Sequence, residues 1–155
     1  MFSDCMSLVS LDLSNFYTIN VKYMSSMFSN CISLESLNLG NFETGNVFWM
    51  DSMFYNCTSL ISLDLNNFRF ISVRTSAYMF YNCKNLEFLN IYNFETFDDG
   101  YYTDMFFGTS DYLIYCMKDN IEDTNQVKIQ LLSKNCSVLD CSSDWKSKKK
   151  NLFQI

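Results

Sequence analysis

The sequence contains no histidine and no proline, and only four of its 155 residues are glycine. Without an imidazole group, Ser-His and Cys-His catalysis and histidine-ligated zinc or haem sites are excluded. So few glycines provide no phosphate-binding loop, and no apolar run reaches the roughly 18 residues of a transmembrane helix. The net charge of −6 argues against nucleic acid as a partner. What is present is a chain that is 48% hydrophobic, enough for one continuous core.

A repeat of 26 residues organises most of the chain. A Met-Phe pair recurs in each copy without insertion, and columns of cysteine, leucine, asparagine and phenylalanine keep the same phase. Four full copies cover residues 1–104, and a fifth starts at Met105 and decays. An ungapped period of this length predicts a solenoid, in which each coil packs only on its neighbours. The pairs are Met1-Phe2, Met27-Phe28, Met53-Phe54, Met79-Phe80 and Met105-Phe106.

A short strand is predicted in every copy. In the first copy, Leu11 and Leu13 are two residues apart, while Ser10, Asp12 and Ser14 around them are polar. This alternation is typical of a strand with one buried face. Stacked coils are expected to align such strands in a parallel sheet with a spacing of ~4.8 Å.

A short helix is predicted after each strand. Val21, Met24, Phe28 and Cys31 follow a spacing that places them on one face of a helix, over about residues 21–28. The column before it holds residue types that favour helix N-caps, and the column after it holds types that tolerate a left-handed backbone. These columns are Asn20, Asn46, Ser72 and Asp98, and then Asn30, Asn56, Asn82 and Gly108.

The unit MFSNCISLESLNLGNFETGNVFWMDS, residues 27–52, resembles the leucine-rich repeats of BspA-like surface proteins. The resemblance covers residues 1–104. It implies an α/β fold, a leucine-rich-repeat-like right-handed solenoid with one short parallel strand and one short helix per repeat. It also implies cell-surface or secreted localisation and adhesion to host or cell-surface ligands. The family offers no catalytic residues to carry over, so no enzyme activity is expected.

The chain is predicted to comprise three segments. Residues 1–116 form the solenoid, residues 117–141 form a C-terminal cap with a helix over 124–134, and residues 142–155 form a flexible basic tail. The first residues already follow the repeat template, so they are not expected to be a secretory signal. The chain is therefore expected to be a fragment, with an apolar face and an unpaired strand edge on its first coil. Membrane attachment is expected only through segments outside this chain.

The seven cysteines fall into two groups. Because no CxxC pair suggests a metal site, the repeat cysteines are expected to be buried free thiols. In the cap, a disulfide is expected if the protein is extracellular, joining Cys116 to either Cys136 or Cys141. No metal and no cofactor are expected. The repeat cysteines are Cys5, Cys31, Cys57 and Cys83.

The concave face of the sheet is the expected ligand-binding surface. Its first coils carry small polar side chains. In the fourth coil, Phe88 and Tyr92 either provide the aromatic residues typical of binding hot spots or pack beneath the cap. The predicted ligand-binding residues are Ser10, Asp12, Ser36, Asn38, Ser62, Asp64, Asn66, Phe88, Asn90 and Tyr92. A rim beside the sheet is expected from Tyr17, Glu43, Arg69 and Glu95.

The sequence thus predicts a non-enzymatic protein-interaction module and leaves its setting open. One alternative is part of an adhesin-like surface protein that binds a protein or glycan on a cell or matrix surface. The other is an intracellular protein-protein interaction scaffold. A purely structural array without a dedicated ligand is a third. An upstream signal peptide or lipobox would favour the first.

Overall fold

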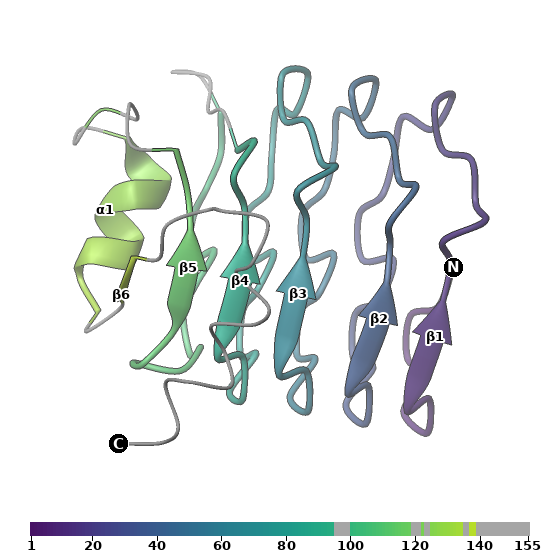
Figure 1. Cartoon of the computed structure of the whole chain (residues 1–155), viewed down its shortest axis with the longest axis horizontal. Helices are drawn as coiled ribbons and strands as arrows, with labels where there is room; N and C mark the ends of the chain where they lie inside the picture. The colour runs from purple at the N-terminus through teal and green to yellow at the C-terminus, as the bar shows by residue number, and fades with distance from the viewer. Residues whose placement is uncertain (95–99, 119–121, 123–124, 135–136, 139–155) are drawn as a thin grey trace.

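The chain winds into a right-handed solenoid in which each repeat forms one coil (Figure 1). The structure is a computed structural model, and it describes residues 1–94, 100–118, 122, 125–134 and 137–138. The strands lie along one side of the body, the strand side, and the chain runs back along the opposite side, the return side. The elements are β1 Ser10–Asp12, β2 Ser36–Asn38, β3 Ser62–Asp64, β4 Phe88–Asn90, β5 Ile114–Cys116, α1 Gln126–Leu132 and β6 Ser137–Val138.

The predicted solenoid with one short parallel strand per repeat is confirmed. The strands pair in the register that the repeat dictates, with Leu11 opposite Leu37 and Leu63 opposite Leu89. The degenerate fifth copy continues the pattern, because β5 pairs with β4 through Tyr115 opposite Leu89.

The strand side is divided into two sheets. β1 pairs with β2, whereas β3, β4, β5 and β6 form a separate four-stranded sheet. At the strand ends, Leu13 donates its N–H to the Asn38 carbonyl and Leu65 donates to the Asn90 carbonyl, both at 2.9 Å. Leu39 makes no such bond to the third coil in the described part of the chain. The strand side is therefore interrupted between the second and third coils.

The helix predicted over residues 21–28 is wrong. This segment is a series of turns whose N–H groups bond the next coil: Met24 donates to the Trp49 carbonyl at 2.8 Å, and Phe28 donates to the Met53 carbonyl at 2.9 Å. An α-helix would direct these groups to carbonyls four residues back in its own chain. The solenoid instead satisfies them between coils, so the return side is a second ladder rather than a row of helices.

Residues with a positive φ form the third position of these tight turns. Met27 donates its N–H to the Met24 carbonyl at 3.3 Å, and Ser26, the third residue of that turn, has φ of 56°. The turn from Phe28 to Cys31 is alike, with Asn30 at φ of 59°. A positive φ at this position is the requirement of a type II turn. The predicted left-handed column is confirmed, since Asn30, Asn56, Asn82 and Gly108 have φ of 59°, 58°, 60° and 72°.

Buried side chains stack in columns between the two sides. The phenylalanine rings of consecutive coils are parallel, with centroid distances of 5.6 Å both for Phe28–Phe54 and for Phe54–Phe80. Beside them, residues such as Cys57 and Leu60 are fully buried. Each coil therefore covers the apolar face of its neighbour.

The helix α1 closes the C-terminal end of the solenoid (Figure 1). As the sequence predicts, a helix in this region buries Val127 and Leu131. Its Gln130 accepts the Phe106 N–H at 3.4 Å and donates to the Tyr102 carbonyl at 2.5 Å. A side chain thus replaces the hydrogen bonds that a further coil would make.

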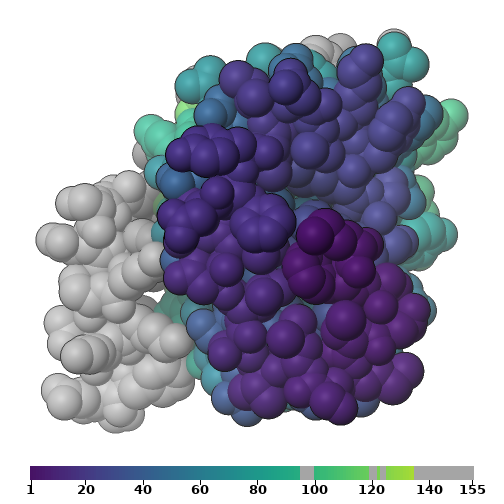
Figure 2. Space-filling model, turned by 90° about the vertical axis from the view of Figure 1, so that its right-hand side faces the viewer, coloured from purple at the N-terminus to yellow at the C-terminus, as the bar shows by residue number. Residues whose placement is uncertain are grey.

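The N-terminal end is uncovered and presents its first coil directly to solvent (Figure 2). Phe16 is 42% exposed there, whereas the equivalent Phe42 of the next coil is fully buried. Leu8 and Leu11 are only partly buried for the same reason. The expected apolar end face is present.

Candidate binding site

The predicted concave face is exposed at its N-terminal half and closed at its C-terminal half. Outward positions of β1 and β2 are exposed, those of β3 are half-buried, and all of β4 is buried. The exposed members of the predicted set are Ser10, Asp12, Ser36, Asn38, Asn66 and Tyr92, and the half-buried ones are Ser62 and Asp64.

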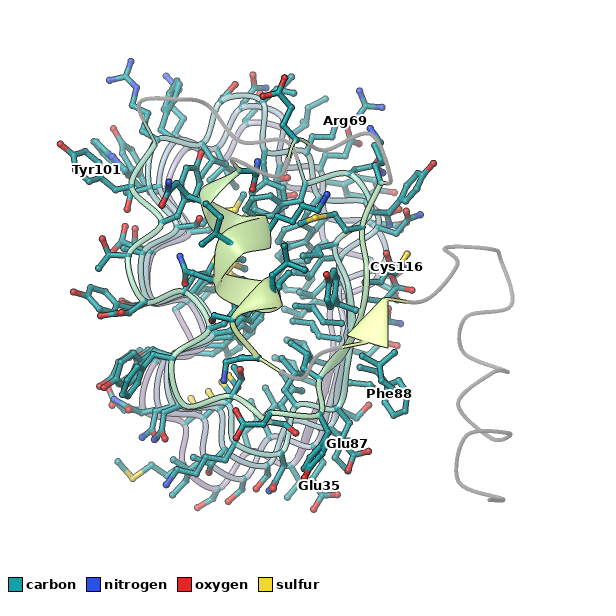
Figure 3. The ribbon with its side chains drawn as sticks, turned by 90° about the vertical axis from the view of Figure 1, so that its left-hand side faces the viewer. Glu35, Arg69, Glu87, Phe88, Tyr101 and Cys116 are labelled. Carbon is teal, nitrogen blue, oxygen red and sulfur yellow. The ribbon has the colours of Figure 1, made fainter. Side chains whose placement is uncertain are left out.

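Of the two alternatives left open for Phe88, the structure contradicts the exposed hot-spot residue. Phe88 is 1% exposed, and Asn90 on the same strand is 5% exposed. The strand that carries them is paired with β3 and with β5, and burial of so large an apolar ring is favourable. Figure 3 shows Phe88 on the strand side near the C-terminal end. Tyr92 remains accessible, with 39% of its surface exposed, and Lys118 lies 5.6 Å from its ring centroid.

Several predicted binding residues shape the backbone at the strand ends. Asp12 accepts the N–H of Ser14 at 2.9 Å, and Asn38 accepts the N–H of Gly40 at 3.1 Å. The same bond recurs in the third and fourth coils. The Ser14 backbone hydrogen bond, helped by the Ser14 side chain, lowers the pKa of Asp12. The main role of these Asp and Asn side chains is therefore to form the turn that ends each strand, and contact with a ligand is secondary.

A groove of about 860 Å³ lies just beyond those turns, across the first four coils. Asn66 of the predicted ligand-binding set lines this groove, together with Tyr17, Glu43 and Arg69 of the predicted rim, whereas the other predicted ligand-binding residues do not. Asparagine is the most frequent lining residue, and two aromatic residues and two side chains of opposite charge accompany it. The lining residues are Tyr17, Ile19, Gly40, Asn41, Phe42, Glu43, Thr44, Gly45, Asn46, Asn66, Asn67, Arg69, Ile71 and Asn93.

Buried threonines fix the floor of the groove. The Thr18 hydroxyl donates to the Glu43 carbonyl at 3.0 Å and accepts the Glu43 N–H at 2.8 Å. Thr44 makes the same pair of bonds to Arg69, at 3.0 and 2.7 Å. Thr18 is 6% exposed and Thr44 is fully buried. The backbones that carry Glu43 and Arg69 are thus held in place by the preceding coil.

Side-chain amides and a hydroxyl join the coils along the same groove. Asn46 donates to the Ile19 carbonyl at 2.8 Å, and Ser72 donates to the Gly45 carbonyl at 2.7 Å. These two positions were predicted as helix N-caps. Instead they bond the coil before them, because no helix follows. Asn67 donates to the Gly40 carbonyl in the same manner.

The charged groups of the groove are available to a ligand. Glu43 and Arg69 lie at equivalent positions of adjacent coils, but they form no salt bridge or side-chain hydrogen bond among the described residues. Tyr17, one coil earlier, is 86% exposed. Figure 3 shows Arg69 at a corner of the body, away from Phe88. Of the expected rim, Glu95 lies outside the described residues.

The repeat cysteines form no reactive cluster. The thiol of Cys57 donates to the Phe28 carbonyl at 3.1 Å, and that of Cys83 donates to the Phe54 carbonyl at 3.0 Å. Burial raises the pKa of Cys57 to about 12 and the pKa of Cys83 well above its ordinary value. These thiols are protonated at neutral pH, so they make poor nucleophiles and poor metal ligands. Among the described residues, no cluster of acidic or cysteine side chains could hold a metal ion.

Cys116, at the end of β5, differs from the repeat cysteines. Cys116 is disulfide-bonded, whereas Cys5, Cys31, Cys57 and Cys83 carry free thiols. Cys136 and Cys141, the two predicted alternatives for its partner, lie outside the described residues.

Comparison with known proteins places the repeat in a family. The family described as "Mycoplasma protein of unknown function, DUF285" matches residues 1–128. The chain belongs to this family. The DUF285 match runs from the first coil into α1, so the repeat and the start of the cap helix both lie within it. No curated protein and no solved structure matches the chain.

The DUF285 description states no function. The structure has a polar, open groove on a repeat scaffold, with its backbone fixed by hydrogen bonds between coils. The described part of the chain contains no helix of the length and apolarity needed to cross a membrane.

Proposed function

We propose that this chain is a non-enzymatic interaction module that binds its ligand in the groove beyond the strand ends. The observation that carries the proposal is the preorganisation of the groove. Glu43 and Arg69 sit on backbones clamped by buried threonines, yet their own side chains have no partner in the described residues. A ligand that pairs with them gains charge-assisted hydrogen bonds without having to order the chain.

The ligand class that suits this groove is a protein or glycan on a cell or matrix surface. The groove is open, rich in asparagine amides and bordered by the exposed ring of Tyr17. Tyrosine and asparagine together provide apolar contact and adaptable hydrogen bonding, a combination common in recognition surfaces. The resemblance of the repeat to BspA-like surface proteins supports an adhesin-like role.

Binding is tested with the whole chain on a glycan microarray and on a panel of immobilised extracellular-matrix proteins. The double variant Glu43→Ala, Arg69→Ala is expected to lower binding to the recognised probe at least tenfold. The matched control, Glu35→Ala with Lys84→Ala, removes one charge of each sign elsewhere and is expected to bind normally. Equal binding by both double variants, with unchanged thermal unfolding, would reject the groove as the site.

We also propose that the chain acts at the cell surface or after secretion. The disulfide at Cys116 supports an oxidising compartment, because such bonds rarely persist in the cytosol. Antibody labelling of intact cells that produce the natural protein tests this point. Labelling that requires permeabilised cells would instead favour the intracellular scaffold.

A further inference from the structure

A second feature with the character of a binding site lies on the return side, away from the groove. One column of the ladder there holds Tyr23, Trp49, Thr75 and Tyr101, joined in sequence by parallel bridges. The Tyr23 and Trp49 rings are stacked, with centroids 4.7 Å apart and planes inclined by 26°. The three aromatic side chains are exposed to 60%, 40% and 71%. Figure 3 shows Tyr101 on the side of the body opposite the strands.

The column has a gap where the third coil carries Thr75 instead of an aromatic residue. Adjacent coils are ~4.8 Å apart, so Trp49 and Tyr101 stand about 10 Å apart with only a small side chain between them. One flat ring inserted there would lie about 5 Å from each neighbour, close to the 4.7 Å spacing of the Tyr23–Trp49 pair. The gap therefore matches a single aromatic ring.

A positive charge lies next to this gap. The guanidinium carbon of Arg74 lies 5.6 Å from the ring centroid of Phe48, which holds it by a cation–π contact. In the following coil, the position equivalent to Arg74 is Gly100, which has no side chain. The Tyr102 ring lies where a side chain at Gly100 would begin. Beside it is a hollow of about 590 Å³, bordered by Phe48, Ile71, Ser72, Val73, Arg74, Gly100 and Tyr101. Trp49 and Thr75 do not line this hollow, so it adjoins the gap at Tyr101, the aromatic residue that borders both.

The backbone around the gap is fixed. Met50 donates its N–H to the Thr75 carbonyl, and Ser76 donates to the Tyr101 carbonyl, both at 3.0 Å. Tyr101 in turn donates to the Arg74 carbonyl at 2.9 Å. The backbone positions of Trp49 and Tyr101 are therefore set before any ligand arrives, which lowers the entropic cost of binding.

We propose that this gap binds an aromatic side chain of a partner protein that carries a carboxylate beside the ring. The ring stacks between Trp49 and Tyr101 in the place of the missing aromatic residue, and the carboxylate pairs with Arg74. The gap shares none of its column residues with the groove, although the hollow beside it and the groove both border Ile71. The module therefore presents two neighbouring contacts. A pyranose ring is a poorer match, because it is thicker than an aromatic ring and has no π system.

The experiment uses indole-3-acetate as the probe and follows the Trp49 indole N–H by NMR on the whole chain. A dissociation constant on the order of 1 mM is expected for a ligand of this size. Cyclohexylacetate keeps the carboxylate but has no aromatic ring, and tryptamine keeps the ring but reverses the charge. Both are expected to bind at least tenfold more weakly.

Variants separate the two parts of the proposed site. Thr75→Trp fills the gap and is expected to abolish binding, while Thr58→Trp, which adds a tryptophan elsewhere, is expected to bind normally. Tyr101→Ala removes one wall and gives a second test if Thr75→Trp alters the fold, with Tyr112→Ala as its control. Arg74→Gln is expected to remove the preference for indole-3-acetate over tryptamine.

Three outcomes would overturn the proposal. One is equal binding of cyclohexylacetate and indole-3-acetate by the natural chain. Another is unchanged binding of the probe in both Thr75→Trp and Tyr101→Ala. The third is stronger binding of methyl glucuronide than of indole-3-acetate, which would make the gap a glycan site. Binding of the probe is independent of Glu43 and Arg69, so failure of the groove proposal leaves this test intact.

Discussion

The strand side and the return side are built from the same repeat, but the backbone hydrogen bonds that join neighbouring coils are more regular on the return side. On the strand side, the ladder stops between β2 and β3, and the first outward strand position ranges from exposed at Ser36 to 1% exposed at Phe88. On the return side, the phenylalanine N–H bonds the next coil at 2.9 Å in every step from Phe2 to Phe80. The hydrogen bonds of the return side hold the coils together, so the residue types on the strand side and at the corners beside it can vary.

This difference separates stability from recognition within one repeat. Both candidate sites lie where the repeat columns change identity, such as Tyr17, Glu43 and Arg69 in one and Thr75 in the other. The columns that do not change are the buried ones behind them. Variation is therefore tolerated where the backbone is already fixed by neighbouring coils.

The largest effect is expected from breaking the return side at Phe54. Phe54 is fully buried, and its ring stacks on one ring of each adjacent coil. Phe54→Ala is expected to lower the free energy of unfolding by about 4 kcal/mol, because the cavity cannot collapse between fixed coils. Ile61→Ala, on the strand side and 39% exposed, is expected to cost less than about 1 kcal/mol. Urea unfolding of both variants checks the comparison, and similar losses would contradict it.

A smaller effect is expected from the asparagine column of the same side. Asn56 has φ of 58°, donates to Asn30 Oδ1 at 3.1 Å and accepts from Asn82 Nδ2 at 2.6 Å. Asn56→Ala should cost about 2 kcal/mol, because it loses both bonds and strains a left-handed residue. Asn56→Gly relieves the strain and should cost about 1 kcal/mol. If the two variants unfold at the same urea concentration, the backbone does not contribute to the loss.

The smallest effect is expected from the buried thiols as the pH rises. Below the ordinary pKa of 9.0, Cys57 is protonated in both the folded and the unfolded chain, so it adds no pH dependence. Above it, only the unfolded chain loses the proton until the pH nears about 12, and the folded state loses stability. The expected loss at pH 10 is about 1 kcal/mol per such thiol.

Urea unfolding at pH 8 and pH 10 measures this loss. The natural chain is compared with the variant Cys57→Ala, Cys83→Ala, which lacks two of the thiols but keeps the tyrosines and lysines that titrate in the same range. An equal pH dependence in the two proteins would show that the thiols are not protected by burial.

The sequence was sufficient to predict the period, the strands and the buried columns, because their side chains repeat in type. It misled about the return side. Val21, Met24, Phe28 and Cys31 point inward at intervals of three or four residues, and a chain of tight turns satisfies that spacing as well as a helix does. A positive φ in each coil distinguishes these turns from a helix. Their residue types do not predict that conformation, and the residues are Ser26, Ser52, Tyr78 and Asp104.

The candidate sites were predictable only in part. The rim residues Tyr17, Glu43 and Arg69 do line the groove, but nothing in the sequence shows that buried threonines clamp their backbones. The exposure of Phe88 was left open between two alternatives, because alternation identifies a face of a strand and not what covers that face. The gap at Thr75 depends on the return side being a ladder, so it could not be predicted from a helix.

The threonine, asparagine and serine bonds between coils span intervals of 25 to 27 residues along the groove. A tandem duplication or a deletion of one whole repeat in the gene would keep the 26-residue phase, so each buried phenylalanine of the return side would still stack on a phenylalanine of the next coil. Such an event would change the length of the groove and the set of charges along it. Recombination between its own repeats is thus a route to new binding specificities in which every intermediate gene still encodes a chain with the same repeat phase.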